Sequence, residues 1–153
     1  MALRGLISSD YNTTRNNVNK MIHKDWPRED LTKNSYPRIH FSSVTETGDA
    51  VAIGQKASTE NTYVIQMDIW VWDKPSDPQF LTVNSTTVSG TRARDEIARN
   101  VLYLLRKNFY TDSNLTGYYD YRVRANRVIP FDEDKGLQRR SIEIEFKEMD
   151  TGA

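Results

Sequence analysis

The sequence YVIQMDIWVW at residues 63–72 is the most informative stretch of the chain, because its two faces would differ sharply in a strand. Side chains alternate across a β-strand, so every second residue points the same way. One face is apolar and suits a core: Tyr63, Ile65, Met67, Ile69 and Val71. The other face mixes an amide, a carboxylate and two indoles: Val64, Gln66, Asp68, Trp70 and Trp72. This second face suits a partly wet surface that meets a partner, which favours assembly over catalysis.

The residues before this stretch predict two further strands. The three predicted strands lie at residues 36–44, 51–56 and 63–72. A turn is expected at Gly48-Asp49, and a second polar turn at residues 57–61. Short links of this kind predict an antiparallel meander.

Two helices are expected on the same face of this sheet. Thr13 or Thr14 can cap a short helix that runs to about Lys24. The longer helix spans roughly residues 88–109, at about 1.5 Å per residue long enough to cover a sheet. Its predicted inner residues include Ala93, Ile97, Val101, Leu104 and Leu105. Its predicted outer residues are Arg92, Arg94, Arg99 and Arg106.

Two long strands are predicted to close the fold, at residues 118–131 and 138–148, with an acidic turn at residues 132–136 between them. In the last strand, Ile142, Ile144 and Phe146 are expected to point inward. The order of helix, three strands, long helix and two strands predicts an α+β fold. It would be a single mostly antiparallel sheet of about five strands with helices packed on one face.

One domain at residues 13–149 is expected, between a flexible N-terminal arm at 1–12 and a flexible tail at 150–153. Within it, residues 73–86 are predicted to form a long polar connection containing Pro75 and Pro78. Connections of this length often carry a function or lie on a partner.

Composition narrows the possible functions. Lys and Arg total 21 and Asp and Glu total 21, so the formal net charge is zero and wholesale binding to a polyanion is not indicated. The chain has no cysteine, which excludes disulfides and thiolate chemistry. No apolar run approaches the roughly 18 residues of a membrane span.

Motifs for catalysis, cofactors and metals are weak. His23 and His40 lie on different predicted elements, and the acidic turn at 132–134 lacks the alternating ligands of a calcium loop. Residues 89–91, Ser-Gly-Thr, lack the lysine and further glycines of a phosphate loop, so they are interpreted as a helix cap. We therefore predict no catalytic residue, no cofactor and no metal ligand, and expect that the protein is not an enzyme.

Arginines gather on the last two predicted strands and allow two interpretations. The cluster comprises Arg122, Arg124, Arg127, Arg139 and Arg140. Cross-strand ion pairs with Glu143 and Glu145 are one interpretation, and the zero net charge favours it. The other is a single-stranded nucleic-acid-binding module, in which Tyr118, Tyr119 and Tyr121 stack on bases.

The tryptophans also leave two interpretations open. Trp70 and Trp72 can pack under the N-terminal helix or the 73–86 connection, or they can lie in a subunit interface, where aromatic residues are enriched.

Several short phrases, taken in order, resemble a known family. They are YPRI at 36–39, DIWVW at 68–72, SGTRARDEIA at 89–98, FDEDKGL at 131–137 and SIEIEF at 141–146. Over about residues 12–148, this pattern resembles the tail terminator, or tail-completion, proteins that join tail to head in tailed viruses.

The resemblance implies a small α+β subunit of a ring, usually a hexamer, that caps the tail tube in the virion at the head–tail junction. The implied partners are other copies of the chain, the major tail tube protein and a head-completion or neck protein, with no membrane. DNA would pass through the channel without sequence-specific binding, and assembly would take place in the host cytoplasm. A head-completion adaptor or stopper of the neck is the close alternative.

This reading assigns candidate residues to two surfaces. The candidate subunit or partner interface comprises Gln66, Asp68, Trp70, Trp72, Pro75, Pro78 and Phe80. The candidate channel or DNA-facing residues are Arg122, Arg124, Arg139 and Arg140.

Overall fold

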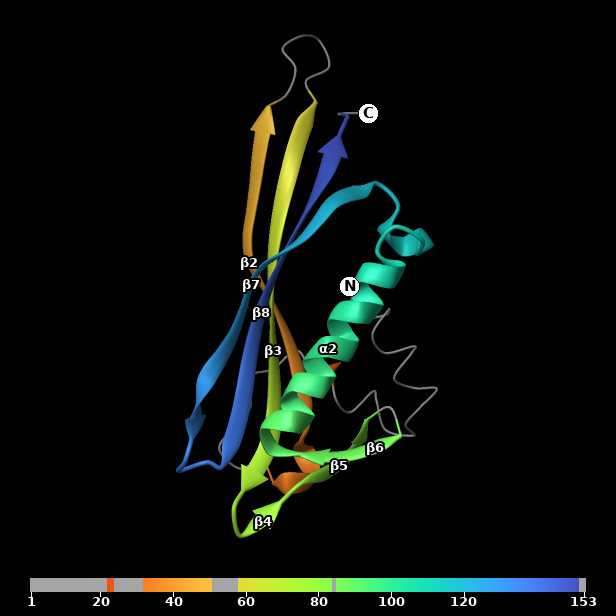
Figure 1. The fold of residues 1–153 in the computed structure, drawn as a ribbon. Helices are drawn as coiled ribbons and strands as arrows, with labels where there is room; N and C mark the ends of the chain where they lie inside the picture. Colours follow the sequence, from red (N-terminus) through yellow and green to blue (C-terminus); the bar gives the residue numbers. More distant parts are fainter. Residues whose placement is uncertain (1–21, 24–31, 51–57, 84, 152–153) are drawn as a thin grey trace.

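One long twisted sheet dominates the computed structural model, which describes residues 22–23, 32–50, 58–83 and 85–151 (Figure 1). Its strands are β1 (Ile22–His23), β2 (Arg38–Ala50), β3 (Thr59–Lys74), β8 (Leu137–Asp150) and β7 (Tyr118–Asp132), in that spatial order, with β4 (Asp77–Pro78) paired to β3. Among the described residues, β1 and β2 pair in parallel and the other strand pairs are antiparallel.

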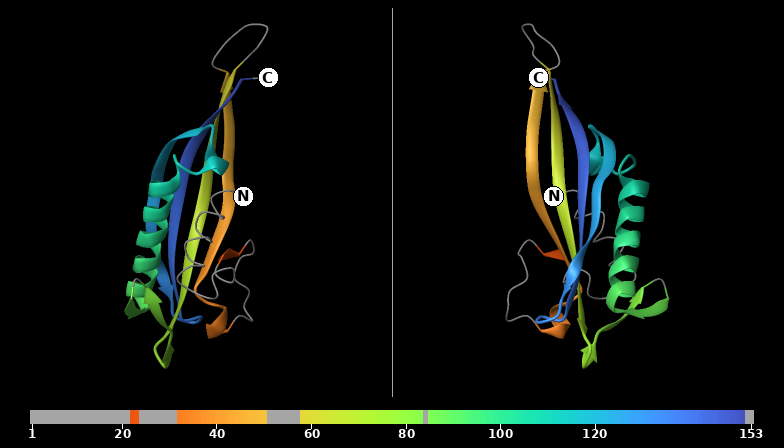
Figure 2. Two further views of the ribbon diagram at one scale, coloured as in Figure 1. Left: turned by 90° about the vertical axis from the view of Figure 1, so that its right-hand side faces the viewer. Right: turned by 60° about the vertical axis from the view of Figure 1, so that its left-hand side comes forward.

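The remaining elements lie beside this sheet. They are a two-stranded sheet of β5 (Phe80–Val83) and β6 (Thr86–Ser89), the helix α2 (Gly90–Asn108), and two 3₁₀ turns at Lys33–Ser35 and Ser113–Leu115. The helix lies against one face of the long sheet (Figure 2). The predicted mostly antiparallel α+β class is confirmed, but the expected five strands are wrong, because the described residues form eight strands.

The core lies between α2 and this face of the sheet. Its fully buried members include Met67, Ile69 and Val71 of β3, Ile142 and Ile144 of β8, and Ala93, Ile97, Val101 and Leu105 of α2. Tyr63 and Ile65 are partly buried against the same cluster. The core face predicted for residues 63–72 is therefore confirmed, as is the inward face of the last strand.

The predicted three-stranded meander is wrong, because β2 and β3 pair directly along nearly their whole length. Gly48 lies opposite Asn61 and Asp49 lies opposite Glu60, so residues 48–49 and residues 59–61 of the expected turns are strand instead. A Cβ atom at position 48 would lie 2.8 Å from the Asn61 Oδ1 atom. Glycine at this position therefore leaves room for the Asn61 side chain on the neighbouring strand. The predicted strand at 51–56 lies outside the described residues.

Of the predicted N-terminal arm and helix, the structure describes only residues 22–23. Ile22 and His23 form β1 beside Ile39 and His40 of β2, where the sequence predicted the end of a helix. Pairing with β2 determines that these two residues form strand, and the local sequence pattern does not encode this pairing. The rest of that predicted helix and the arm at 1–12 lie outside the described residues.

The connection at 73–86 and the start of α2 also differ from expectation. Strands β4, β5 and part of β6 occupy the predicted loop, so the helix begins at Gly90 and not at about Val88. Ser89 takes the N-cap position, but its side chain makes no capping hydrogen bond. The Asp73 carboxylate stands close to Gly90 instead, where a negative charge stabilises the positive end of the helix dipole.

The turn before β8 requires glycine at position 136. Gly136 has a φ of 64°, and a Cβ there would lie 3.1 Å from the Lys74 Cα atom. We expect Gly136→Ala to lower the free energy of unfolding by more than about 1 kcal/mol in urea titrations. Gly117→Ala is the control, because Gly117 also has a positive φ but no neighbour within 4 Å. If Gly136→Ala lowers the free energy of unfolding no more than Gly117→Ala does, the positive φ alone explains the loss of stability and the contact with Lys74 does not contribute.

Candidate assembly surface

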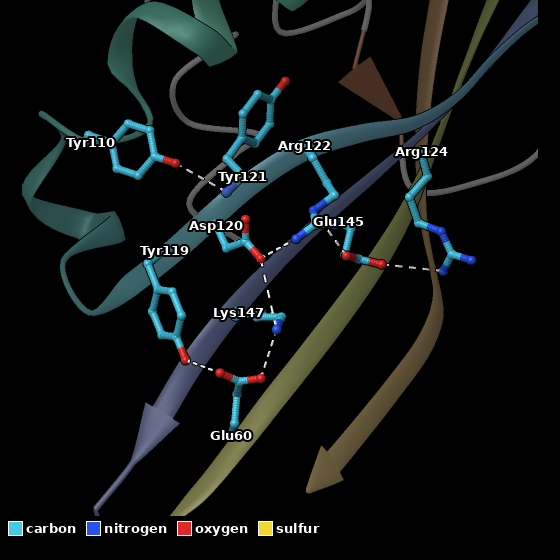
Figure 3. Close-up of polar contacts among 9 residues, drawn as sticks. All are labelled: Glu60, Tyr110, Tyr119, Asp120, Tyr121, Arg122, Arg124, Glu145 and Lys147. Atoms are coloured by element: carbon cyan, nitrogen blue, oxygen red, sulfur yellow. Dashed lines mark hydrogen bonds and ion pairs between the residues drawn. The ribbon is translucent and has the colours of Figure 1, made fainter. Parts of the chain in front are cut away.

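A polar network ties three strands together on the sheet face away from α2 (Figure 3). Glu60 of β3 is its centre. The Tyr119 hydroxyl donates to Glu60 Oε2 at 2.6 Å, and Lys147 Nζ donates to Glu60 Oε1 at 2.8 Å. The register permits this, because Lys147 lies between Thr62 on β3 and Tyr119 on β7. One carboxylate thus holds β7 and β8 to the β2–β3 hairpin.

Arginines extend the network along β7. Arg122 Nε lies 3.4 Å from Glu145 Oε1, and an Arg124 terminal nitrogen lies 3.5 Å from Glu145 Oε2. Arg122 also contacts Asp120, whose carboxylate lies 3.8 Å from Lys147 Nζ. The register shifts between Val123 and Ala125, so both arginines reach the same glutamate. Ion pairing with Glu145, predicted from the sequence, is confirmed.

The hydrogen bonds to Glu60 shift the pKa values of the groups around it. The hydrogen bond from Lys147, followed by that from Tyr119, lowers the pKa of Glu60. The same hydrogen bonds raise the pKa of Lys147 and the pKa of Tyr119. The network therefore favours a charged glutamate, a charged lysine and a neutral tyrosine together.

This shift predicts a pH dependence for the network. A carboxylate whose pKa is lower in the folded state stabilises the protein above its unfolded pKa, and this contribution is lost as pH falls through the folded pKa. We expect wild type to be more stable than Glu60→Gln at neutral pH, and the difference to shrink below pH 4.5, the ordinary value for this glutamate. Urea titrations at several pH values measure it, and a difference that grows on acidification would contradict it.

A second polar cluster on the same face is buried. Asp68 is 0% exposed, and its Oδ1 accepts hydrogen bonds from Arg139 Nε at 3.1 Å and from a terminal Arg139 nitrogen at 2.9 Å. Gln66 Nε2 donates to Asp68 Oδ2 at 2.8 Å. The Arg139 guanidinium lies 4.7 Å from the Trp70 ring centre, and Trp70 is also buried. Asp68 and Trp70, predicted as interface residues, thus lie in the interior of the chain.

The other predicted interface residues lie at one end of the sheet. Trp72 Nε1 donates to the Asp77 carbonyl at 3.0 Å, so this indole packs against the 73–86 segment. Pro78 is half-buried in β4, and Pro75 is exposed. Phe80 is 66% exposed. Phe80 and Pro75 are therefore its accessible members.

The four predicted channel residues do not form one surface. Arg122 and Arg124 lie together in the β7 network, and Arg139 is held by buried Asp68. Arg140 is on the opposite face, where it contacts Asp95 of α2 at 2.8 Å. Burial alone raises the pKa of Asp95, but hydrogen bonds from Arg94 and Arg140 outweigh this, and its pKa is lowered.

The structure also corrects the predicted position of Arg94. The sequence placed it on the outer side of the helix, but it is 4% exposed. Its Nε donates to Asp95 Oδ1 at 2.8 Å, and a terminal nitrogen donates to Gln138 Oε1 at 3.2 Å. Acceptors on α2 and β8 therefore allow this arginine to be buried.

The two edges of the long sheet carry exposed residues whose edge position was not predicted from the sequence, although Arg124 and Arg127 were noted in the arginine cluster. Strand β7 is one edge, with exposed side chains that include Val123, Arg124, Arg127 and Val128. At the other edge, the described residues of β1 pair with Ile39 and His40, and β2 continues with exposed residues 45–49, including Glu46 and Asp49. A possible signal was the set of β-branched threonines at positions 45, 47, 59 and 62, which favour strand.

Sites of two other classes are absent from the described residues. No group of three or more His, Cys, Asp or Glu side chains in that part of the chain is placed to hold a metal ion. No helix there combines the length and apolarity needed to cross a membrane.

Comparisons with known proteins add no family to these observations. Neither a scan against protein-family models nor a search of curated protein sequences gave a match.

Proposed function

We propose that the chain is a tail terminator of a tailed virus, a ring subunit that caps the tail tube and joins it to the head. The observation that carries this proposal is that the elongated subunit exposes an aromatic side chain, Phe80, beside β4 at one end, and a row of polar residues on β2 towards the other end. The sequence phrases that resemble tail terminators support the same function.

Towards one end, the exposed residues of β2 are polar, and two of them are acidic. Strands β2 and β3 extend beyond α2 (Figure 1), and residues 45–49 of β2 are all exposed, among them Glu46 and Asp49. The opposite end, at β4 and β5, presents exposed Phe80 and Pro75. A joining protein must bind two different partners. The exposed aromatic side chain of Phe80 distinguishes the β4–β5 end, which also carries the exposed carboxylate of Asp77, from the end where β2 carries Glu46 and Asp49.

Electron microscopy of the protein with uncapped tail tubes tests this function. We expect rings at one end of each tube and none along its sides. Phe80→Ser should weaken either tube capping or head joining while leaving the other, because it alters only one end. Tyr103→Ser is the matched control, since Tyr103 is a similarly exposed aromatic residue on α2. Tubes whose ends stay bare at every protein concentration would rule out the terminator function.

The head-completion alternative gives a different result in the same experiment. A neck adaptor or stopper would bind to heads and leave isolated tubes uncapped. Electron micrographs of the protein mixed separately with heads and with tubes therefore distinguish the two functions.

The nucleic-acid-binding alternative is weakened by the ion pairs on β7. Arg122 and Arg124 both contact Glu145, so part of their charge is already neutralised within the chain. A single-stranded nucleic-acid-binding module would bind oligonucleotides with an affinity that falls steeply with salt. We expect no such binding at low salt.

A further inference from the structure

We infer that the partner bound where β2 and β3 extend beyond α2 adds a β-strand to the open edge of β2 at residues 45–49. This inference rests on the proposed joining function, and it names how one of the two joined partners is held. The occupant is an extended segment of the partner protein that carries lysine or arginine side chains on both of its faces.

Residues 45–49 form an unpaired sheet edge within the described part of the chain. Residues 45–50 of β2 keep an unbroken register with residues 59–64 of β3 on one side. On the other side, β2 pairs with β1 at Ile39 and His40, and no other described strand lies there. Alternate backbone N–H and C=O groups of residues 45–49 therefore point away from β3, where an added strand can pair with them.

Both faces of this edge are accessible. Successive side chains of a strand point to opposite faces, and all five residues 45–49 are exposed. Figure 1 shows the reason on the helix side, because β2 and β3 continue beyond the end of α2. An added strand could therefore place side chains on either face of the sheet.

The opposite edge of the sheet, β7, is protected against strand addition. Its register with β8 shifts at three places, and it carries Pro130 and exposed Arg127. Bulges, prolines and basic side chains are features that prevent an edge from pairing with another strand. Residues 45–49 contain no register shift, no proline and no basic residue. Strand addition is therefore favoured at β2.

The charges of this edge determine the chemistry of its partner. Glu46 lies opposite Tyr63 on the face that packs against α2 farther along, and Asp49 lies opposite Glu60 on the other face. Neither carboxylate forms an ion pair with a described residue. A second β2 strand would bring carboxylates together, whereas basic side chains would form favourable cross-strand pairs.

A further carboxylate adds negative charge beside Glu46. The Tyr63 hydroxyl donates a hydrogen bond to Glu148 Oε2 at 2.8 Å. This hydrogen bond raises the pKa of Tyr63 to about 12, with smaller contributions from burial and from the charges of Glu148 and Glu46. No described cation pairs with Glu148 either. A basic side chain on this face would therefore meet two carboxylates.

Glu46→Lys with Asp49→Lys tests the charge requirement against tail tubes and, separately, heads. We expect binding to one of these partners to weaken by about tenfold or more, because two favourable cross-strand pairs become repulsive. Binding to the other partner, the one that Phe80→Ser weakens, should be unchanged. Electron micrographs over a protein titration measure both, and circular dichroism confirms folding. Glu133→Lys with Asp134→Lys is the control, because it makes the same charge change at the exposed turn before β8.

Amide hydrogen exchange tests whether the backbone of β2 pairs with the partner. In the free chain, the outward N–H groups of residues 45–49 should exchange rapidly, because no described strand covers them. We expect them to become protected when the wild type is bound to the partner that the charge variant fails to bind. Residues 123–128 on the β7 edge are the control, and their exchange should not change there.

The outcomes separate this inference from the proposed function. Unchanged binding of the charge variant to both partners, or outward amides that exchange as fast in the complex as in the free chain, would overturn strand addition. Loss of rings by the charge variant without tubes or heads would identify a second copy as the occupant and would also overturn it. Capping of tubes by the wild type would leave the terminator function standing in each case. A wild-type chain that binds neither tubes nor heads would overturn both.

Discussion

Asp68→Ala is expected to lower the free energy of unfolding by about 3 kcal/mol, near the lower end of the range for breaking a buried ion pair. Asp68 is 0% exposed and accepts hydrogen bonds from Arg139 and Gln66. Its removal would leave the Arg139 guanidinium without this carboxylate. Because the Arg139 side chain is 21% exposed, solvent would compensate for part of the loss.

Urea titration monitored by circular dichroism measures this effect. Asp49→Ala is the control, because Asp49 is an exposed aspartate on β2 and should change stability by no more than about 0.5 kcal/mol. A double-mutant cycle of Asp68→Asn with Arg139→Gln isolates the pairwise term. Equal losses for Asp68→Ala and Asp49→Ala would contradict the interior role of Asp68.

Phe109→Ala is expected to lower the free energy of unfolding by about 3–5 kcal/mol, the usual range for truncating a buried aromatic ring. Phe109 follows the last turn of α2 and is 1% exposed. Its ring centre lies 4.9 Å from that of Tyr121 on β7 and 5.7 Å from that of Phe146 on β8. Truncation would therefore open a cavity where the helix end meets two strands.

Tyr103→Ala is the control for this prediction, since Tyr103 is 61% exposed on the same helix. Phe109→Leu should cost less than Phe109→Ala, because it retains more of the buried volume. Urea titration gives the stabilities, and amide hydrogen exchange at Tyr121 reports whether β7 loosens. A loss for Phe109→Ala no greater than that for Tyr103→Ala would contradict the packing role of Phe109.

Strong local patterns predicted much of the fold correctly. Alternation identified the core face of β3 and the inward residues of β8, and helical spacing identified Ala93, Ile97, Val101 and Leu105 on the inner side of α2. The turn before β8 was also predicted, and there Lys135 and Gly136 donate backbone hydrogen bonds to Asp132. These features depend on near neighbours in the sequence, so their signal is local.

The predictions were wrong at positions whose structure depends on contacts with residues far away in the sequence. The polar residues around Gly48 look like a turn, yet they form strand because Thr59–Asn61 pair with them. Arg94 looks solvent-facing, yet it is buried because Gln138, 44 residues away, accepts its hydrogen bond. Trp70 looks like an interface residue, yet it lies buried under the Arg139 guanidinium.

The sequence by itself determined which residues face the core, because burial follows the period of apolar residues along a strand or helix. It also favoured ion pairs between arginines and glutamates across β7 and β8, and the structure shows them for Arg122 and Arg124 with Glu145. Only the tertiary structure decided that Asp68 and Trp70 belong to the interior and that Glu46, Asp49 and Arg127 lie at open sheet edges. The physical reason is that exposure of a polar strand residue depends on which strand lies beside it, and this neighbour is set by pairing over long distances in the chain.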